Sequence, residues 1–292
     1  MIRRAAVLGA AGQLGTELVR ELNARGYRTT AWDRRRLDIS DAAAVESALA
    51  SCEAEVVFNS AAYNQVDVAE TEPLAALQVN ALAVRNLALA CRQLDIRLVH
   101  FSTDYVFDGL ASSPYREDAP TRPLSAYAVS KLTGELYARA YLETPLIVRT
   151  CGVFGPAGRH TARGNFVELM LRLAGSAKPI RVVEDHVASP TFAPWLAART
   201  IDLVERGQAG IFHIGGGTPI AWFDFAHMIF EVAGLTPELT PTNEREYRTA
   251  ARRPKYSALS NAKMEAAGIA PMPTLHEAVE TYFSQRNAQS AD

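Results

Sequence analysis

A doubly wound α/β fold with a parallel sheet is predicted for this 292-residue chain by two patterns in its sequence. In the first half, short apolar runs alternate with longer segments of helical periodicity, which is the order that βαβ units require. The strand-like runs are apolar at nearly every position, as expected when helices cover both faces of a sheet. The alternation loosens after Phe154, so a smaller C-terminal part, interleaved with the end of the first, is predicted as well.

The elements of the first part can be placed one after another. A strand is predicted over 5–8, and Leu18, Val19 and Leu22 give helical spacing to the segment 16–25, which ends at Gly26. Four more strands are predicted from runs rich in β-forming residues, at 27–32, 55–62, 96–103 and 145–154. Helices are predicted between them over 42–49, 74–94 and 130–141. Together these segments predict the βαβ units of one parallel sheet.

The two parts of the chain are expected to exchange segments. The first part takes residues 1–150, and parts of 179–215 return to it. The smaller part, expected to bind the substrate, takes 151–178 and 216–285. Residues 286–292 are expected to fray, as chain ends commonly do.

Composition and charge exclude several classes of protein. A formal net charge of -2 gives no sign of a nucleic-acid surface, and the three cysteines form neither a CxxC motif nor a Cys/His cluster, so no disulfide framework or metal site is predicted. The first residues lack the layout of a signal peptide, and no apolar run approaches the ~18 residues of a membrane span. We therefore expect a soluble cytoplasmic protein without nucleic-acid or membrane partners, as a monomer or homodimer.

Three glycines stand three apart between the first strand and the first helix. A dinucleotide site needs a tight turn, a position where backbone approaches the pyrophosphate, and a small residue where helix meets strand. Gly9, Gly12 and Gly15 are suited to these tasks in that order, and the helix N-terminus would attract the phosphates. The spacing alone also fits a plain turn with packing glycines. In this strand-to-helix context it predicts a Rossmann-type site.

The second strand carries two conflicting signals about the cofactor. Asp33 ends this strand, where a carboxylate would accept hydrogen bonds from ribose hydroxyls and favour NAD. Arg34 and its two arginine neighbours follow at once, and one of them could pair with the 2′-phosphate of NADP. Asp38 and Ile39 are placed to flank the adenine. The sequence thus predicts NADPH or NADH, with NADPH slightly favoured.

Further along the chain, two features add to this site. The small residues Ala61 and Ala62 end the third strand, where they let a cofactor lie close to the backbone. Tyr127 and Lys131 stand four apart and therefore share one face of a helix. A nearby ammonium lowers the pKa of a phenol, so Tyr127 could act as a general acid or base near neutral pH. Thr103, at the end of the fourth strand, could polarise the same carbonyl.

These motifs occur with others in a characteristic order: GAAGQLG, LDISD, NSAA, VNALAVRNL, STDYVF and YAVSK. Longer matching stretches are STDYVFDG (102–109), NFVELMLRLA (165–174), ASPTFAPWLA (188–197) and RRPKYSALSNAKM (252–264). In this order and at these spacings the chain resembles the extended short-chain dehydrogenase/reductase family, and within it the dTDP-4-dehydrorhamnose reductases. The resemblance covers nearly the whole chain.

The resemblance implies roles for residues at matching positions. Thr103, Tyr127 and Lys131 would form the catalytic triad, with Tyr127 giving a proton to the C4 oxygen of a nucleotide-linked 4-keto-6-deoxyhexose as hydride reaches C4 from the nicotinamide. The expected reaction turns dTDP-4-dehydro-L-rhamnose into dTDP-L-rhamnose. The candidate cofactor residues, besides Tyr127 and Lys131, are Gly9, Gly12, Gln13, Leu14, Gly15, Asp33, Arg34, Asp38, Ile39, Ala61, Ala62, Tyr63 and Asn80, the last of which would support the lysine through its backbone and water. The candidate substrate residues are Thr103, Asp104, Tyr105, Tyr127, Gly152, Asn165 and Arg253.

One position departs from the reductases that the chain resembles. They commonly carry Ser-Trp after the Arg-Thr that ends the fifth strand, and the Trp contacts the sugar, whereas Cys151 and Gly152 follow Thr150 here. Loss of an indole removes a large flat contact surface. Either the basic loop over 155–165 replaces it, or the sugar differs.

Two other functions stay open. A non-catalytic NADP-binding regulatory subunit, similar to the methionine adenosyltransferase β subunit, would have the same fold, although the complete set of Thr103, Tyr127 and Lys131 argues against it. An epimerase, or a reductase of a different nucleotide sugar, would use the same scaffold. A 4,6-dehydratase is disfavoured because Tyr105, and not a second acid, follows Asp104.

Overall fold

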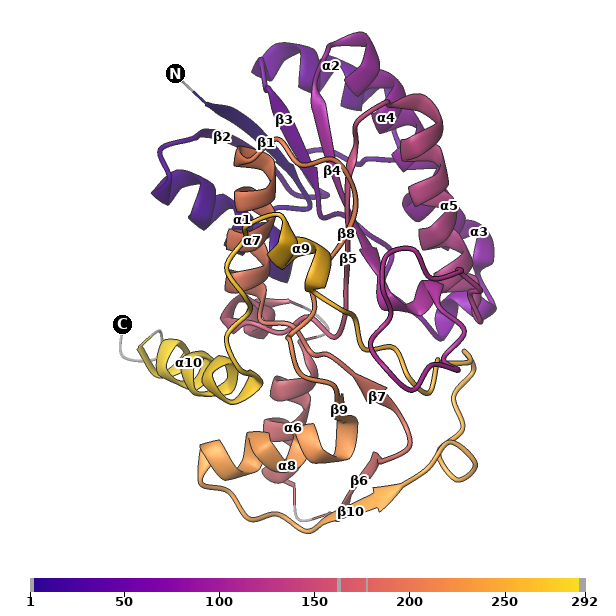
Figure 1. The fold of residues 1–292 in the computed structure, drawn as a ribbon, viewed down its shortest axis with the longest axis vertical. Helices are drawn as coiled ribbons and strands as arrows, with labels where there is room; N and C mark the ends of the chain where they lie inside the picture. The colour runs from indigo at the N-terminus through magenta and orange to yellow at the C-terminus, as the bar shows by residue number, and fades with distance from the viewer. Residues whose placement is uncertain (1–2, 162–163, 177, 289–292) are drawn as a thin grey trace.

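A computed structural model describes residues 3–161, 164–176 and 178–288. Its centre is a six-stranded parallel sheet with the order β2-β1-β3-β4-β5-β8 (Figure 1). The strands are β1 (Arg4–Leu8), β2 (Arg28–Trp32), β3 (Val56–Asn59), β4 (Arg97–Thr103), β5 (Leu146–Thr150) and β8 (Gly210–His213). The chain moves from β1 outward to β2 and then back across β1 to β3. This reversal confirms the predicted doubly wound sheet and opens a crevice at the carboxyl ends of β1 and β3.

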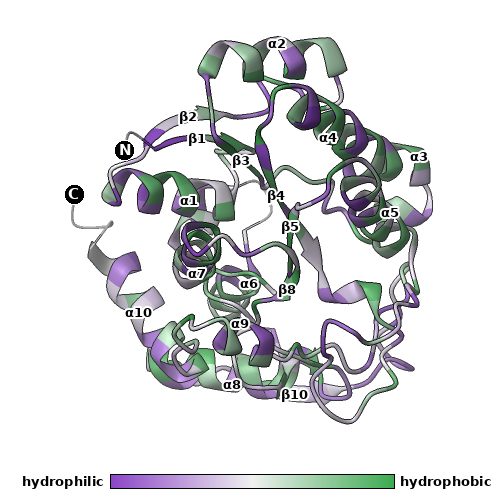
Figure 2. Cartoon of the chain, turned by 45° about the horizontal axis from the view of Figure 1, so that its top comes forward, coloured by the Kyte–Doolittle hydropathy of each residue, from purple (hydrophilic) through white to green (hydrophobic). Residues whose placement is uncertain are grey.

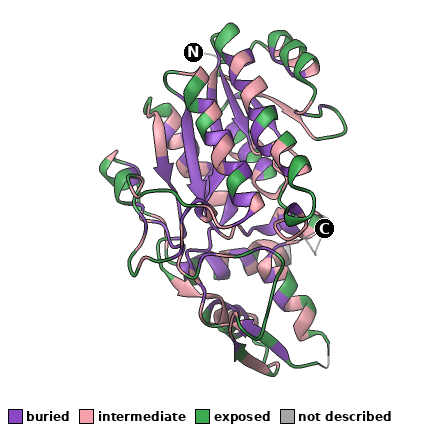
Figure 3. Ribbon diagram, turned by 90° about the vertical axis from the view of Figure 1, so that its right-hand side faces the viewer, coloured by how far each residue is buried: buried purple, intermediate pink, exposed green. Residues whose placement is uncertain are grey.

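Helices cover both faces of the sheet. On one face lie α1 (Gln13–Ala24) and α7 (Ala193–Glu205), and on the other α2 (Ala42–Cys52), α4 (Ala83–Gln93) and α5 (Ala126–Tyr141) (Figure 1). Alternate strand residues divide between the two faces: Val7 and Phe58 pack under α1 and α7, while Ala6 and Val57 pack under α2 and α4. The apolar strands therefore lie buried between helical layers (Figures 2 and 3).

The long helix expected over 74–94 forms as one run with three sections. They are α3 (Pro73–Leu77), a π-helical section at Gln78–Leu82, and α4. By length and apolar composition alone, Pro73–Gln93 could cross a membrane, contrary to the expectation that no run approaches that length. Half of its most apolar window is buried, and Val84 and Leu87 belong to the core under the sheet. The same composition is expected of a helix in a protein core.

The smaller part of the fold lies beyond the carboxyl ends of the strands (Figure 1). Its elements are α6 (Phe166–Ala174), β6 (Ile180–Val183), β7 (Val187–Ala188), β9 (Ile220–Ala221), α8 (Trp222–Ala233), β10 (Leu239–Thr242) and α10 (Leu275–Ala288). Strand β10 pairs in parallel with β6, and β9 pairs antiparallel with β7. A separate core, with Phe154, Phe225 and Tyr282 at its centre, holds these elements together.

Three features differ from the expected layout. Helix α7 was not predicted, although it covers the large sheet together with α1. The short helix α9 (Ala262–Ala266) falls in the range expected for the smaller part, yet Met264 belongs to the core under α1 and α7. Helix α10 extends to Ala288, so residues 286–288 are helical and not frayed, while 289–292 lie outside the described residues.

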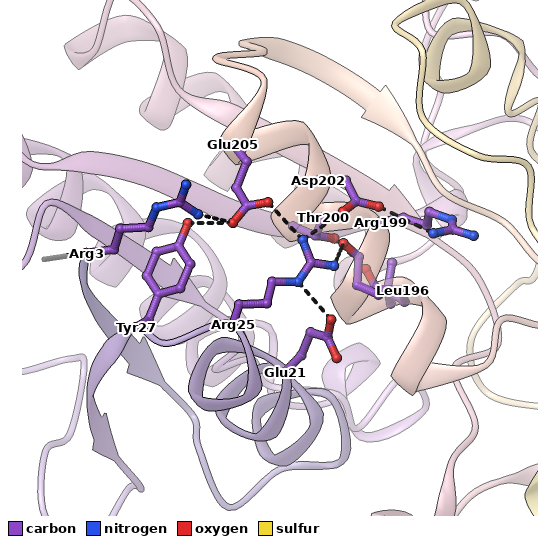
Figure 4. A network of polar contacts seen from close by, with 10 residues as sticks. Arg3, Glu21, Arg25, Tyr27, Leu196, Arg199, Thr200, Asp202 and Glu205 are labelled. Atoms are coloured by element: carbon purple, nitrogen blue, oxygen red, sulfur yellow. Dashed lines mark hydrogen bonds and ion pairs between the residues drawn. The ribbon is translucent and has the colours of Figure 1, made fainter. Parts of the chain in front are cut away.

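An ion-pair network fastens α7 to the first βα unit (Figure 4). The Arg25 guanidinium donates to Glu21 at 2.8 Å, to Asp202 at 2.7 Å and to Glu205 at 3.0 Å. Hydrogen bonds and charge from Glu21 and Asp202 more than offset partial burial, so the pKa of Arg25 is raised. Arg25 therefore stays charged and connects the end of α1 to α7, although the two helices lie far apart in the sequence.

Candidate active site

A cavity of about 560 Å³, here called the central cavity, lies at the carboxyl ends of the parallel strands. It is lined by residues from the segments that follow β1, β3, β4 and β5 and by α5. Thr103, Tyr127 and Lys131 all line it, so the structure brings these three predicted catalytic residues together. Other lining residues that were candidates are Gly12, Gln13, Leu14, Ala62, Asp104 and Gly152.

A second cavity of about 400 Å³, the β2 cavity, adjoins the first. The two share Gly12, Ser60, Ala62 and Asn64 as lining residues. The candidates that line only the β2 cavity are Gly9, Asp33, Arg34, Asp38, Ile39, Ala61 and Tyr63. The joined cavities thus run past the glycine turn from the end of β2 to Tyr127, along the crevice where doubly wound sheets bind ligands.

The glycine turn leaves no room for side chains. Gly9 has φ +77°, and a Cβ there would lie 2.7 Å from the backbone nitrogen of Ala61. At Gly15 a Cβ would lie 2.2 Å from the carbonyl oxygen of Gly9, so Gly15 serves the close packing of α1 on the turn and does not line either cavity. Gly12 is the N-cap of α1 and carries no capping side chain. The first N–H groups of α1 are therefore free to bind an anion.

The end of β2 combines one carboxylate and one arginine at the β2 cavity. Asp33 Oδ1 accepts hydrogen bonds from the backbone N–H groups of Arg35 and Arg36, at 3.1 and 3.0 Å. This arrangement fixes the Asp33 side chain at the strand end. Of the three consecutive arginines, Arg34 is the one among the lining residues, and its side chain is largely exposed.

Helix α5 presents Tyr127 and Lys131 to the central cavity. Ser125 caps the helix by accepting from Ala128 N–H at 3.3 Å, so α5 begins at Ala126, four residues before the predicted start. Lys131 is buried, and its ammonium donates to the carbonyl oxygen of Phe101 at 2.6 Å. Burial lowers the pKa of Lys131 to about 8, and the charge of Glu135 partly opposes this shift. Lys131 is thus mostly charged at neutral pH and lies one helical turn from Tyr127.

Thr103 is engaged by its neighbours in the chain. Its hydroxyl donates to Asp104 Oδ1 at 3.0 Å and accepts from Tyr105 N–H at 3.2 Å. Asp104 is buried, and burial raises its pKa to about 6 despite opposing interactions with Ser257, Cys151 and Thr103. A carboxyl group that changes its protonation state near neutral pH therefore controls the direction of the Thr103 proton.

The side chain of Asn80 contacts the loop after β3 and helix α5. It lies in the π-helical section, is buried, and is not among the residues lining the central or β2 cavity. Its amide accepts from Tyr63 N–H at 2.8 Å and donates to the Tyr63 carbonyl at 3.0 Å and to Ser130 Oγ at 3.0 Å. Asn80 therefore holds the loop after β3 against α5 through its side chain, and the expected support of Lys131 through its backbone and water stays a prediction.

A third cavity of about 380 Å³, the α8 cavity, lies between the large sheet and the smaller part. Tyr105 and Arg253 line it, together with Trp222 and apolar residues of α6. The Arg253 guanidinium forms a bidentate pair with Asp67, with N···O distances of 2.7 and 3.1 Å. This pair fixes the arginine at the cavity wall and connects segments far apart in the chain.

The other two predicted substrate residues have unlike positions. Gly152 lines the central cavity and has φ +48°. Asn165 is the N-cap of α6, accepting from Glu168 N–H at 3.0 Å and donating to Gln13 Oε1 at 2.8 Å and Gly155 O at 3.1 Å. It is absent from the lining of the three cavities among the described residues, and its hydrogen bonds position Gln13 and α6, so a substrate contact of Asn165 stays a prediction.

Sequence reasoning missed several lining residues. Thr161 and Gly164, from the basic loop, reach the central cavity, and Asp67 and Trp222 line the α8 cavity. The unusual length of the loop was the only signal for Thr161 and Gly164. No local pattern in the sequence pointed to Asp67 or Trp222. Within the described part of the chain, no group of three His, Cys, Asp or Glu residues could hold a metal ion.

Comparisons with known proteins agree with this geometry. The family model described as RmlD substrate binding domain matches residues 3–287. The dTDP-4-dehydrorhamnose reductase of Streptomyces griseus is 40% identical over 276 residues, covering 91% of this chain and 88% of that protein. The dTDP-4-keto-6-deoxy-D-glucose reductase of Streptomyces niveus is 35% identical over 293 residues and the whole of both chains.

A solved structure gives the same result at the level of the fold. The dTDP-4-dehydrorhamnose reductase of Bacillus anthracis, determined in complex with NADP, superposes with a TM-score of 0.92 at 33% identity and covers 98% of this chain and 100% of its own. The resemblance seen in the sequence is thereby confirmed. The chain belongs to the RmlD substrate binding domain family, among the extended short-chain dehydrogenases/reductases.

Proposed function

We propose that this protein is an NADPH-dependent reductase of a nucleotide-linked 4-keto-6-deoxyhexose, converting dTDP-4-dehydro-L-rhamnose to dTDP-L-rhamnose. The observation that carries the proposal is the meeting of Thr103, Tyr127 and Lys131 in a cavity continuous with the glycine turn. Relatives named for this reaction, at 35–40% identity, support the substrate class.

The residues present fit a nicotinamide dinucleotide. Backbone at Gly9 and Gly12 would receive the pyrophosphate at the start of α1. Gly9 keeps this turn tight, since a side chain there would meet the Ala61 backbone. Asp33 and Arg34 would hold the adenosine end, with Arg34 beside the 2′-phosphate. When bound, the reduced cofactor supplies the hydride. Lys131 would hydrogen-bond the ribose beside it.

Proton delivery rests on residues of α5 and β4. Tyr127 gives its phenolic proton to the oxygen that gains charge as the carbonyl is reduced. The ammonium of Lys131 stabilises the phenolate that remains, since an opposite charge nearby favours the ionised form. Thr103 lies at the same cavity and donates to that oxygen when its own proton is released from Asp104.

The α8 cavity would receive the nucleotide end of the substrate. Arg253 offers a planar guanidinium suited to a diphosphate, and the apolar wall from α6 suits a base. On this account the large sheet binds the cofactor and the smaller part binds most of the sugar nucleotide. A cytoplasmic location, a monomeric or homodimeric state, and the absence of nucleic-acid and membrane partners stay predictions.

The proposal is tested by product identification. The purified protein is incubated with NADPH and a small panel of nucleotide-linked keto sugars, and the products are identified by NMR. We expect NADPH consumption and dTDP-L-rhamnose from dTDP-4-dehydro-L-rhamnose. Cofactor binding without turnover of any panel member would favour a regulatory subunit. Interconversion of sugars without net NADPH consumption, by protein purified with NAD, would favour an epimerase.

A further inference from the structure

The walls of the central and α8 cavities touch where Gly152 contacts Trp222. Gly152 lines the central cavity and Trp222 lines the α8 cavity. A Cβ built on Gly152 would lie 2.9 Å from Cη2 of the indole and 3.5 Å from Cζ2. The outer edge of the six-membered ring of Trp222 therefore rests on the Gly152 backbone, at the seam between the two cavities.

Glycine at position 152 suits this contact. Its φ of +48° is a conformation that residues with a Cβ rarely adopt, and Pro190 Cα lies 3.3 Å from the built Cβ on another side. The space that a side chain at 152 would fill is taken by the ring of Trp222, from α8, which lies far along the chain. An aromatic surface is thus present at this place, although the sequence near Gly152 lacks one.

The indole is held rigidly. Trp222 is the first residue of α8, and its backbone N–H donates to the His186 carbonyl at 3.2 Å. Phe166 packs at 4.7 Å between ring centroids with an interplanar angle of 60°, and Phe225 packs at 6.1 Å. Trp222 contacts both the core of the smaller part and the cluster around Phe107 and Cys151. A partly buried ring with this support forms a fixed wall.

We propose that Trp222 is a specificity-determining residue that contacts the hexose ring of the substrate. The inference rests on the proposed function. If the reacting carbonyl lies at Tyr127 and the diphosphate lies near Arg253, the hexose between them crosses the seam. There the C–H groups of the sugar pack against the part of the indole that lines the α8 cavity, which offers a rigid apolar surface at low entropic cost. Because Gly152 has no side chain, the indole ring can occupy this position.

The test separates sugar contacts from nucleotide contacts. The affinities of dTDP and of dTDP-L-rhamnose are measured by calorimetry for the wild type and for Trp222→Leu, and KM is measured for dTDP-4-dehydro-L-rhamnose. We expect dTDP-L-rhamnose affinity to weaken and KM to rise by about tenfold, whereas dTDP and NADPH affinities change by less than about twofold. Equal weakening for dTDP and dTDP-L-rhamnose would assign the indole to the nucleotide and overturn the proposal. Unchanged affinities would also overturn it.

Two further variants make the result interpretable. Trp195→Leu removes an indole that packs on Phe192, with 5.0 Å between ring centroids. Trp195 lines none of the three cavities described above, so we expect near-normal affinities for dTDP, dTDP-L-rhamnose and NADPH. Trp222→Phe keeps a ring if the leucine variant does not fold, and we expect a smaller change, about threefold, in sugar affinity alone. If the wild type reduces no keto sugar, the proposed function fails. If the wild type is active and Trp222 variants bind dTDP-L-rhamnose normally, this inference alone fails.

Discussion

The hydroxyl of Thr103 donates its hydrogen bond to Asp104 Oδ1 at 3.0 Å. A hydroxyl has one proton, so while Asp104 is ionised Thr103 cannot offer that proton to a substrate carbonyl. A protonated Asp104 would reverse the bond by donating to Thr103, which would release the Thr103 proton toward the cavity. Since burial raises the pKa of Asp104 to about 6, both arrangements are accessible at physiological pH.

A pH dependence follows from this relationship. We expect kcat/KM to be highest below about pH 6 and to fall by about fivefold above it, which is the size of one lost hydrogen bond. In Asp104→Asn the amide donates to Thr103 at every pH, so this inflection should vanish. The measurement is the pH profile of kcat/KM for both proteins. An inflection near pH 6 that persists in the asparagine variant would show that another group titrates.

The glycine turn predicts a contrast between two substitutions of equal backbone strain. Gly9 and Gly26 have φ of +77° and +76°, but a Cβ at Gly9 would meet the Ala61 backbone, whereas nothing lies within 4 Å at Gly26. Both Gly→Ala variants should lose about 1 kcal/mol of unfolding free energy from strain alone. Only Gly9→Ala should also weaken NADPH binding, by at least about tenfold, because the turn must shift. Fluorescence titration with NADPH measures this, and equal affinities in the two variants would contradict it.

Arg34 is expected to select NADPH over NADH. It is the arginine of the 34–36 run that lines the β2 cavity, so Arg34→Ala should raise KM for NADPH about tenfold and leave KM for NADH nearly unchanged. Arg36→Ala, an exposed neighbour outside the lining, is the matched control and should alter neither value. Steady-state kinetics with both cofactors decides the point. A loss of NADPH preference in Arg36→Ala would contradict this prediction, because it would show that Arg36 contacts the 2′-phosphate.

The buried pair of Glu135 and Arg149 should dominate stability near the site. Arg149 donates to the carboxylate at 2.7, 3.0 and 3.2 Å, and both side chains are buried. Glu135→Gln leaves a buried guanidinium without its counter-charge and should cost about 3–5 kcal/mol of unfolding free energy. The exposed carboxylate of Glu246, paired with Arg181, is the control, since Glu246→Gln should cost under about 1 kcal/mol. Urea unfolding measures the loss of unfolding free energy in both variants, and equal losses would contradict the prediction.

The sheet, and the meeting of the candidate catalytic residues Thr103, Tyr127 and Lys131 at one cavity, could be predicted because their signals are local. Strand and helix periodicity, and the four-residue spacing of Tyr127 and Lys131, are visible within single segments. Contacts between segments that are distant in the chain could not be predicted from the sequence. Asp67 meets Arg253 across 186 residues, and Trp222 reaches Gly152 because β9, the strand that precedes α8, pairs with β7. Asn80 was assigned to the cofactor by resemblance, but its hydrogen bonds depend on a π-helical section that no sequence pattern marks.

A comparison of the wild type with Tyr127→Phe tests whether the phenol of Tyr127 is the proton donor. NADPH consumption is followed with dTDP-4-dehydro-L-rhamnose, and NADPH affinity is measured separately in the same preparations. The account predicts turnover by the wild type, loss of most of it in Tyr127→Phe, and nearly equal NADPH affinities, since the phenol supplies the proton while the glycine turn and Lys131 hold the cofactor. Near-normal turnover in Tyr127→Phe would contradict the account, because the proton would then come from another group.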